Sequence, residues 1–191
     1  ALAANTTASN NTAVGYNSLT ANTTAEYNTA VGASAGAAIT TGAANTAVGK
    51  SALETATTAA NNTALGAYAL RVSTSGASNV AVGHSALALN TTGTQNTAVG
   101  TSALDANTTA SYNTAVGYRS ANDNTGVGNY ALMANTTGND NVAVGAASQL
   151  VSTTATRNTS LGMDTLRACT TGSYNTALGQ RALYASTTGT E

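Results

Sequence analysis

Apolar and polar positions along this chain repeat with a fixed period. The pentapeptide Asn-Thr-Ala-Val-Gly at residues 11–15 returns, with small changes, until the sequence ends. Its opening asparagine recurs at a constant spacing of 17, apart from one spacing of 11 between Asn113 and Asn124. We call one repeat a coil and number its places from this asparagine. Coils begin at residues 11, 28, 45, 62, 79, 96, 113, 124, 141, 158 and 175; residues 1–10 end an earlier coil, and residues 113–123 form one short coil.

The places of a coil differ in what they tolerate, and residues 1–191 form one repeat array. Place 1 is always Asn, place 5 always Gly, place 4 always Val or Leu, and place 3 always small. Place 9 is usually Leu, and places 13 and 14 are a Thr-Thr pair, with Ser75 as the one substitute. Charged residues and tyrosines fall only at places 6, 7, 10, 16 and 17, when Asp123 of the short coil is counted as its last place. Because charged side chains cost most to desolvate, these variable places are predicted to face water.

A 17-residue repeat that is rich in Thr and Val and free of proline predicts a β-solenoid. Helical repeats need about 33 residues or more. We expect one strand at places 2–4, a second near places 8–11, and a third at the Thr-Thr pair. Corners are expected at the glycine of place 5 and the small residue of place 15. The predicted fold class is an all-β parallel β-solenoid of 17-residue coils, stacked about 4.8 Å apart.

The invariant asparagine is expected to be buried and to form a ladder. Stacked asparagines can bond to the copies above and below, as in other stacked strands. Such a ladder satisfies its buried polar groups only when nearly every rung is present. This requirement agrees with the presence of asparagine at place 1 in every coil. The predicted ladder consists of Asn11, Asn28, Asn45, Asn62, Asn79, Asn96, Asn113, Asn124, Asn141, Asn158 and Asn175.

The predicted core is thin. Each coil offers the Val or Leu of place 4 and often the Leu of place 9, and each such side chain contributes about 1.5–3 kcal/mol when buried. Ordering a coil costs about 1 kcal/mol or more for each of its residues. We therefore expect chains to associate, with the small place 3 allowing close approach around an axis. Neither end has the atypical sequence of a capping repeat, so we expect a segment of a longer repetitive chain.

Composition excludes several classes of function. The net charge is −1 with six basic residues, which gives no electrostatic footprint for nucleic acid or anionic lipid. One cysteine, Cys169, excludes an internal disulfide and cannot build a metal site alone. It stands where other coils mostly have Asn or Ser, so a small buried side chain is expected. Apolar runs are too short to span a bilayer, and no export signal is visible.

Residues 79–86, Asn-Val-Ala-Val-Gly-His-Ser-Ala, resemble the head repeats of trimeric autotransporter adhesins, the YadA-like head. The full array also resembles repeats in phage tail fibres. The resemblance implies a left-handed parallel β-roll in which three chains surround one axis, displayed outside the cell or virion. Head repeats are a few residues shorter than these coils, and the Thr-Thr pair supplies the extra corner.

The favoured function is the shaft or head of an extracellular fibre or adhesin, which binds other copies of itself and a host or surface receptor. Constant places would build the rod and variable places would carry contacts, for which tyrosines are suited. An alternative reading is that each tyrosine only covers Ala-rich surface. The candidate surface contacts are Tyr16, Tyr27, Tyr68, Tyr112, Tyr118, Tyr130, Tyr174 and Tyr184.

Ice binding by the threonine columns of places 2, 13 and 14 is the alternative function. Adjacent residues of a strand point to opposite faces, which argues against a flat surface made by places 13 and 14 together. Val80 and Val142 also interrupt the column at place 2. An enzyme is not expected, nor a cofactor or a metal, because His84 has no partner of matching chemistry and acidic residues are scattered singly.

Two further features carry predictions. Asn-Thr-Thr at Asn5, Asn22, Asn90, Asn107 and Asn135 matches the N-glycosylation acceptor pattern, although the repeat itself spells it. The short coil lacks six residues and passes from Ser120-Ala121 to Asn122-Asp123 without a Thr-Thr corner. A notch or bend is therefore predicted at residues 113–124.

Overall fold

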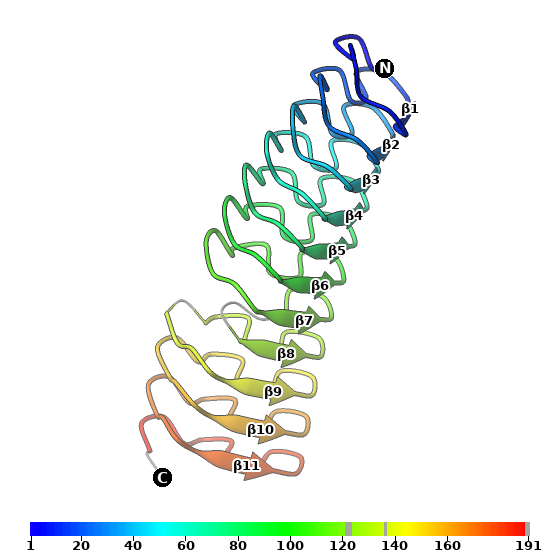
Figure 1. Cartoon of the computed structure of the whole chain (residues 1–191). Helices are drawn as coiled ribbons and strands as arrows, with labels where there is room; N and C mark the ends of the chain where they lie inside the picture. Colours follow the sequence, from blue (N-terminus) through cyan, green and yellow to red (C-terminus); the bar gives the residue numbers. More distant parts are fainter. Residues whose placement is uncertain (121–123, 136, 190–191) are drawn as a thin grey trace. The chain divides into compact units, whose positions relative to one another are not determined.

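The computed structural model describes residues 1–120, 124–135 and 137–189 (Figure 1). Within these residues the protein is all-β, without a helix, and it is the predicted parallel β-solenoid with 17-residue coils. The chain divides into two compact units, Ala1–Ser111 (unit 1) and Tyr112–Glu191 (unit 2). The short coil passes through residues 121–123, so the predicted notch lies outside the described residues.

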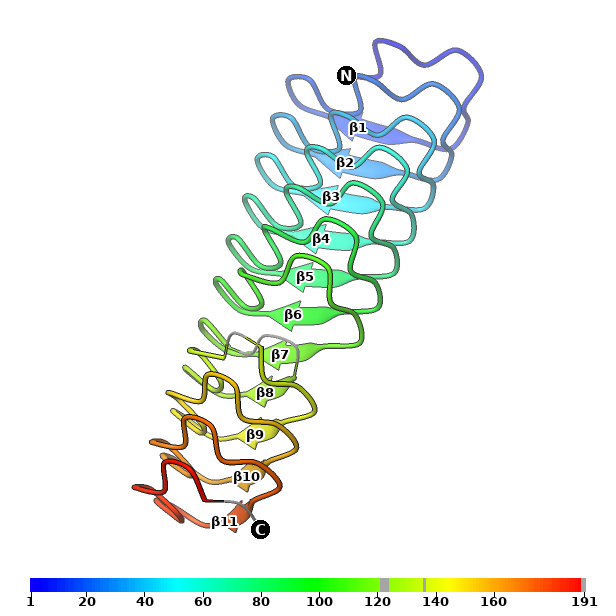
Figure 2. The same ribbon diagram turned by 90° about the vertical axis from the view of Figure 1, so that its left-hand side faces the viewer.

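Each coil contributes one three-residue strand at places 2–4, as predicted, and within each unit the strands pair in parallel, in register from coil to coil (Figures 1 and 2). Unit 1 contains β1 (Thr12–Val14), β2 (Thr29–Val31), β3 (Thr46–Val48), β4 (Thr63–Leu65), β5 (Val80–Val82) and β6 (Thr97–Val99). Unit 2 contains β7 (Thr114–Val116), β8 (Thr125–Val127), β9 (Val142–Val144), β10 (Thr159–Leu161) and β11 (Thr176–Leu178).

The predicted second strand is wrong, because places 7–11 form turns. Side-chain-bearing residues at places 7, 9 and 17 adopt positive φ, for example Ser51 (55°), Leu53 (50°) and Asn61 (59°). Such left-handed residues reverse the chain and prevent a strand. The turns still bond to the next coil, since the Leu53 N–H donates to the Ala69 carbonyl at 3.0 Å.

The glycine of place 5 is required by two constraints. Gly49 has φ of 135°, a region that residues with a side chain rarely adopt. A Cβ built on it would also lie 2.5 Å from the carbonyl oxygen of Gly66 in the next coil. The corner predicted at this place is therefore confirmed, and it is a point at which the backbones of neighbouring coils approach closely.

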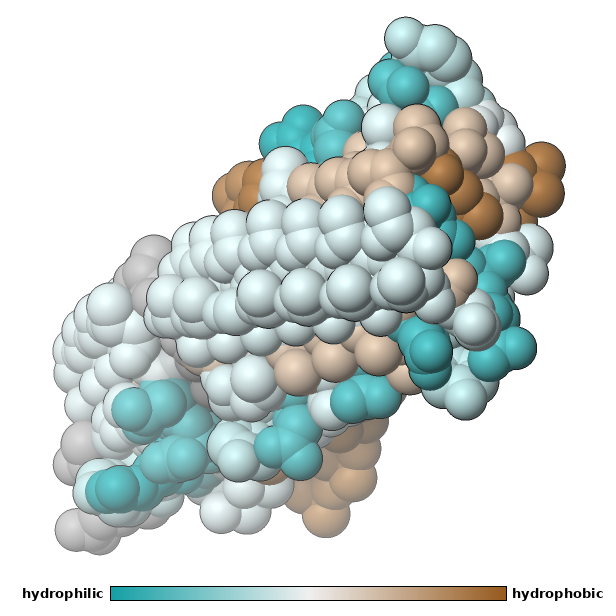
Figure 3. Space-filling view, turned by 45° about the horizontal axis from the view of Figure 1, so that its top comes forward, coloured by the Kyte–Doolittle hydropathy of each residue, from teal (hydrophilic) through white to brown (hydrophobic). Residues whose placement is uncertain are grey.

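The predicted third strand is also wrong, because the Thr-Thr pair lies in a bend. Place 14 is exposed wherever the structure describes it, and place 13 is half-exposed or exposed. Both threonines of a pair therefore reach the surface, and the strand-alternation argument made from the sequence does not apply. Figure 3 shows two regular rows of side chains of intermediate hydropathy on the nearer part of the surface, as stacked threonines produce.

Place 3, and not place 4, points into the coil. Ala47 and Ala64 are at most 1% exposed, and the leucines of place 9, such as Leu53 and Leu70, are fully buried. Because side chains alternate along a strand, an inward place 3 turns places 2 and 4 outward. The prediction that the Val or Leu of place 4 belongs to the core is therefore wrong. The small place 3 serves the interior of its own coil, which has room only for small side chains there, so its assignment to an axis between chains is wrong as well.

The asparagine of place 1 closes its own coil and joins it to the next. In unit 1 the Asn62 Nδ2 donates to the Gly76 carbonyl of the same coil at 2.9 Å and to the Asn45 Oδ1 at 3.2 Å. The Asn62 Oδ1 in turn accepts the backbone N–H of Asn79 at 2.9 Å. All members of the column are buried except Asn11, which is half-buried. Each amide therefore satisfies main-chain groups of two coils.

Place 12 forms a second buried column that the sequence analysis did not identify. Asn22 is fully buried; its Oδ1 accepts the Ala25 N–H at 3.0 Å and its Nδ2 donates to the Ala25 carbonyl at 3.1 Å. Asparagine thus closes a local turn between places 12 and 15. One coil compensates for a missing leucine at this level. A Cβ on Gly36 at place 9 would lie 2.9 Å from Cδ1 of Ile39 at place 12, so the larger isoleucine fills the space.

Unit 2 contains a polar patch at the level of places 3 and 9, which in most coils are alanine and leucine. Gln149 stands at place 9 in the position of leucine and is fully buried. Its Nε2 donates to the Ser160 Oγ at 2.9 Å and to the Val142 carbonyl at 3.2 Å, and the Ser148 and Ser160 hydroxyls lie 2.6 Å apart. The Gln149 Oε1 has no hydrogen-bond partner. A buried acceptor without a partner makes this a weak point of the unit 2 core.

We predict that Asn62→Ala lowers the free energy of unfolding by about 1–3 kcal/mol, since it leaves the buried Asn79 N–H without its partner and leaves the Gly76 carbonyl with only the Ser73 hydroxyl at 3.3 Å. Asn61→Ala is the matched control, because Asn61 is exposed and Ala44 occupies the same place naturally. Chemical denaturation of the two variants gives the comparison. Equal midpoints would show that the column does not stabilise the fold.

We predict that Gln149→Leu raises the free energy of unfolding by about 1–2 kcal/mol, because it removes an unpaired buried oxygen and restores the apolar side chain of the other coils. The reverse change in the preceding coil, Leu132→Gln, should destabilise. Thermal and denaturant unfolding measure both changes. A loss of stability in Gln149→Leu would mean that the polar patch is fully satisfied in solution.

Candidate functional site

The outward side chains of the strands form the most regular surface of the molecule. We call the places 2 and 4 of all strands the seam. Exposed members of place 4 include Val14 (57%), Leu65 (46%), Leu161 (49%) and Leu178 (74%). Threonine occupies place 2 except at Val80 and Val142, and no seam residue is charged. Each unit therefore carries an uncharged, partly apolar strip along its sheet.

Most of the predicted contact tyrosines lie on the surface, but they do not form one site. Tyr16, Tyr27 and Tyr112 are 77%, 62% and 76% exposed. Tyr68 and Tyr184 are half-buried. Among the described residues the one contact between tyrosine rings joins Tyr118 and Tyr130, edge to face with centroids 5.5 Å apart. Tyr174 is 58% exposed and lies in a different setting, described next.

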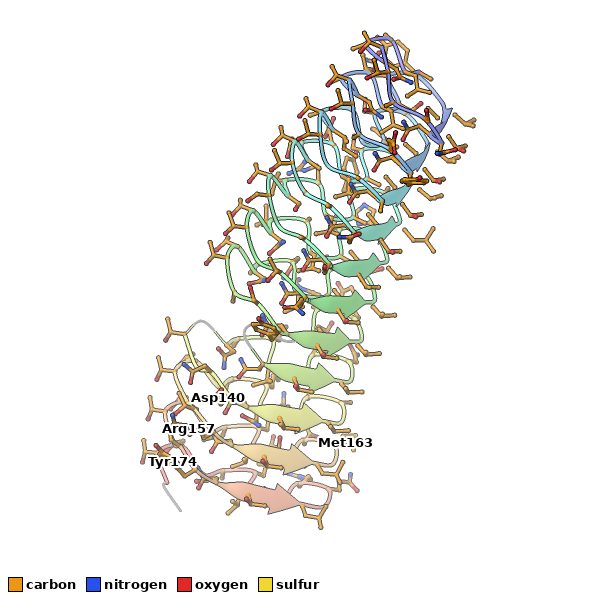
Figure 4. The ribbon with its side chains drawn as sticks, viewed as in Figure 1. Asp140, Arg157, Met163 and Tyr174 are labelled. Atoms are coloured by element: carbon orange, nitrogen blue, oxygen red, sulfur yellow. The ribbon has the colours of Figure 1, made fainter. Side chains whose placement is uncertain are left out.

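Asp140, Arg157 and Tyr174 stand at place 17 of successive coils and lie one above another (Figure 4). The Arg157 guanidinium lies 5.4 Å from the centre of the Tyr174 ring and donates to the Tyr174 hydroxyl, and its Nε lies 3.6 Å from the Asp140 Oδ2. The hydrogen bond and the charge interaction with Tyr174, followed by the charge of Asp140, raise the pKa of Arg157. The group is exposed, and pairs of this kind contribute little to stability.

Two other tyrosines are each flanked by two cations. Lys50 Nζ and the Arg71 guanidinium lie 5.4 and 5.8 Å from the centre of the Tyr68 ring, and the hydrogen bond to Tyr68 raises the pKa of Lys50. His84, which is exposed as predicted, meets the Tyr68 ring edge to face. Lys50 and His84 reach Tyr68 from the neighbouring coils, whereas Arg71 belongs to the same coil as Tyr68; the Lys50 and Arg71 contacts are cation–π interactions.

In unit 2 the equivalent arrangement surrounds Tyr184. The guanidiniums of Arg167 and Arg181 lie 5.8 and 4.6 Å from its ring centre, and Arg167 also donates to the Tyr184 hydroxyl at 3.1 Å. Three tyrosines at the variable places, Tyr68, Tyr174 and Tyr184, are therefore partners for cations of their own chain. The pairing of tyrosines with cations was not predicted from the sequence, although the register of the coils does place Arg167 beside Tyr184.

Several candidate chemical sites are closed by burial. Cys169 is fully buried, as predicted; its thiol donates to the Gly172 carbonyl at 3.4 Å, and burial raises its pKa. Four of the five glycosylation-pattern asparagines are also buried, the fifth, Asn5, being half-buried. Within the described ranges no three His, Cys, Asp or Glu side chains gather as a metal site requires. No described segment is a helix long and apolar enough to cross a bilayer.

No protein-family model, curated protein or solved structure matches this chain. The geometry of its own surfaces is therefore the basis for any functional assignment. Charged residues do not gather into a recurrent site, whereas the seam and the threonine columns recur in coil after coil. Surfaces that repeat with the coil are suited to a partner that is itself extended or repetitive.

We predict that Cys169 does not react with a thiol reagent at pH 8 in the folded chain and reacts fully in denaturant, because burial raises its pKa and blocks access. A control chain carries Cys169→Ala and Ala146→Cys, which moves the thiol to an exposed place, and it should react at once. Absorbance of the released thiolate follows both reactions. Rapid labelling of the folded parent chain would contradict the buried assignment.

Proposed function

We propose that this chain is a structural segment of an extracellular fibre or adhesin, in which copies of the chain associate through the seam. The observation that supports the proposal is the uninterrupted presence of an outward Val or Leu at place 4 of every coil. Exposed apolar side chains that continue along a surface are typical of protein interfaces. The number of coils would then set the length of the interface.

Energetics favour covering the seam. Complete burial of a Val or Leu side chain contributes about 1.5–3 kcal/mol, so covering a half-exposed one adds roughly 1 kcal/mol for each coil. The absence of charge on the seam means that no ion needs to be desolvated on association. The gain is therefore proportional to length, and longer arrays gain more.

A second copy of the chain is the partner that fits best. Strands within a unit are parallel and in register, so the seam presents the same side chains at a constant interval. A closed symmetric assembly brings identical surfaces together and repeats each contact at every subunit. On this basis, and on the resemblance to adhesin head repeats, we propose a left-handed roll in a homotrimer.

Variable places would then face outward and carry attachment. Their tyrosines and cations differ from coil to coil, which suits irregular contacts with a receptor on a host or other surface. The exposed Tyr16, Tyr27 and Tyr112 are the strongest candidates, because no cation of their own chain stacks on them among the described residues. Aromatic side chains are enriched in the residues that dominate binding energy.

We predict that the double variant Val48→Lys and Leu65→Lys raises the dissociation constant of the assembly by roughly 100-fold or more, since like charges facing each other across an interface cost several kcal/mol. Ala33→Lys is the control, because place 6 is exposed and holds Lys50 in the next coil. Analytical ultracentrifugation over a range of concentrations measures the assembly, and far-UV circular dichroism checks the fold. A parent chain that stays monomeric at every concentration would refute association through the seam.

A further inference from the structure

The threonines of place 13 in unit 1 form a continuous ladder. Each hydroxyl donates to the carbonyl of the same place in the next coil, as from Thr40 to Thr57 at 3.1 Å and from Thr57 to Thr74 at 3.2 Å. The same carbonyls also accept backbone N–H groups of places 13 and 14. Six successive rungs carry this hydroxyl bond in unit 1. The bond fixes the side-chain rotamer and therefore also fixes the position of the methyl group.

Place 14 adds a second column beside the first. Its side chain is exposed in each coil of unit 1, while the flanking places 12 and 15 are mostly buried. The adjoining places 11 and 16 of unit 1 carry a single charge, Glu26. We call these two columns the threonine face; its members are Thr6, Thr7, Thr23, Thr24, Thr40, Thr41, Thr57, Thr58, Thr74, Ser75, Thr91, Thr92, Thr108 and Thr109.

The spacing of this face is close to a spacing in ordered water. Coils joined by backbone hydrogen bonds repeat about every 4.8 Å, so the seven rungs of unit 1 extend for about 29 Å. Water molecules bonded tetrahedrally at about 2.75 Å place their second neighbours about 4.5 Å apart. Neighbouring rungs can therefore hold waters close to the spacing of an ice-like row. The mismatch of about 0.3 Å per rung adds up to about 1.8 Å over the six intervals of unit 1, so the match holds over a few rungs at a time.

Threonine supplies both groups that such a row needs. A hydroxyl anchors a water by a hydrogen bond, and a methyl beside it leaves neighbouring waters to bond with one another. Because the rotamers of place 13 are fixed in the free protein, ordering water costs no further side-chain entropy there. The near absence of charge matters as well, since ions orient water around themselves and disrupt a regular lattice.

We propose that the threonine face of unit 1 orders water in an ice-like array and binds the surface of ice. This activity is separate from association through the seam, because it uses places 13 and 14 while the seam uses places 2 and 4. The proposal rests on the hydroxyl ladder, the exposure of both columns and the uncharged surroundings. An array of this length contacts several lattice rows at once, which is what adsorption to a crystal requires.

The test uses the complete chain in an ice-affinity and thermal-hysteresis assay. The parent chain should partition into a growing ice hemisphere and shape single ice crystals. The double variant Thr41→Tyr and Thr58→Tyr should lose most of the hysteresis, because two protruding tyrosine rings prevent the ice surface from contacting the threonine face. The milder Thr41→Ser and Thr58→Ser should lose part of it, and serine is tolerated there since Ser75 occupies the same place.

Two controls separate this activity from folding and from assembly. Ala33→Tyr adds the same ring at an exposed place that holds Tyr16 in the preceding coil, and it should leave the hysteresis unchanged. Val48→Lys with Leu65→Lys should retain ice binding even where the assembly dissociates. A parent chain without ice retention, equal activity in the tyrosine variants, or binding to crystalline cellulose or chitin with no effect on ice would each overturn the proposal.

Discussion

The whole fold depends on the asparagine of place 1. Its Nδ2 reaches the carbonyl of place 15 in the same coil, over 2.7–3.0 Å in the ten coils for which this bond is described. Its Oδ1 accepts the main-chain N–H of the next asparagine within each unit. A shorter or longer side chain would leave buried main-chain groups unpaired, at a cost of about 1–3 kcal/mol each. That penalty recurs at each rung, which explains why asparagine occupies place 1 in every coil.

This closure also holds the strained turns in place. In most coils three places put residues with side chains in the left-handed region, which costs roughly 1–2 kcal/mol for each residue. A single coil has too small a core to offset such strain, because only an alanine, a leucine and small neighbours point inward. The turns bond to the next coil instead, as Leu53 does to Ala69, so a coil becomes stable when it stacks. Stability in this fold is therefore a property of neighbouring coils together.

Much of this arrangement could be predicted from the sequence, because a strict period places equivalent residues one above another. The strands at places 2–4, the corner at Gly49 and the burial of Cys169 followed from that register and from elementary chemistry. Which residues of the strand face the interior did not follow from the period. Larger residues usually lie inside, so the sequence pattern assigns Val48 to the core and Ala47 to a contact, whereas the coil is so narrow that only a small residue fits at the place of Ala47. The positive φ of Leu53 could not be predicted either, because leucine has no preference for the left-handed region. Of the candidate site, the exposure of the tyrosines followed from their variable places, but their cation partners required the positions of neighbouring turns.

Comparing the residues at one place in all coils of this chain shows which places are restricted by packing in the interior and which are not. Places 6, 7 and 10 are exposed or half-exposed in many coils and have diverged freely. Place 14 is also exposed, and among the described residues its side chain makes no hydrogen bond that would hold a coil together, yet it is threonine with a single serine. Place 4 is outward as well and is always Val or Leu. Packing within a coil accounts for neither restriction. The restriction of both columns is consistent with the two proposed contacts, an apolar one at place 4 and a hydroxyl-rich one at place 14.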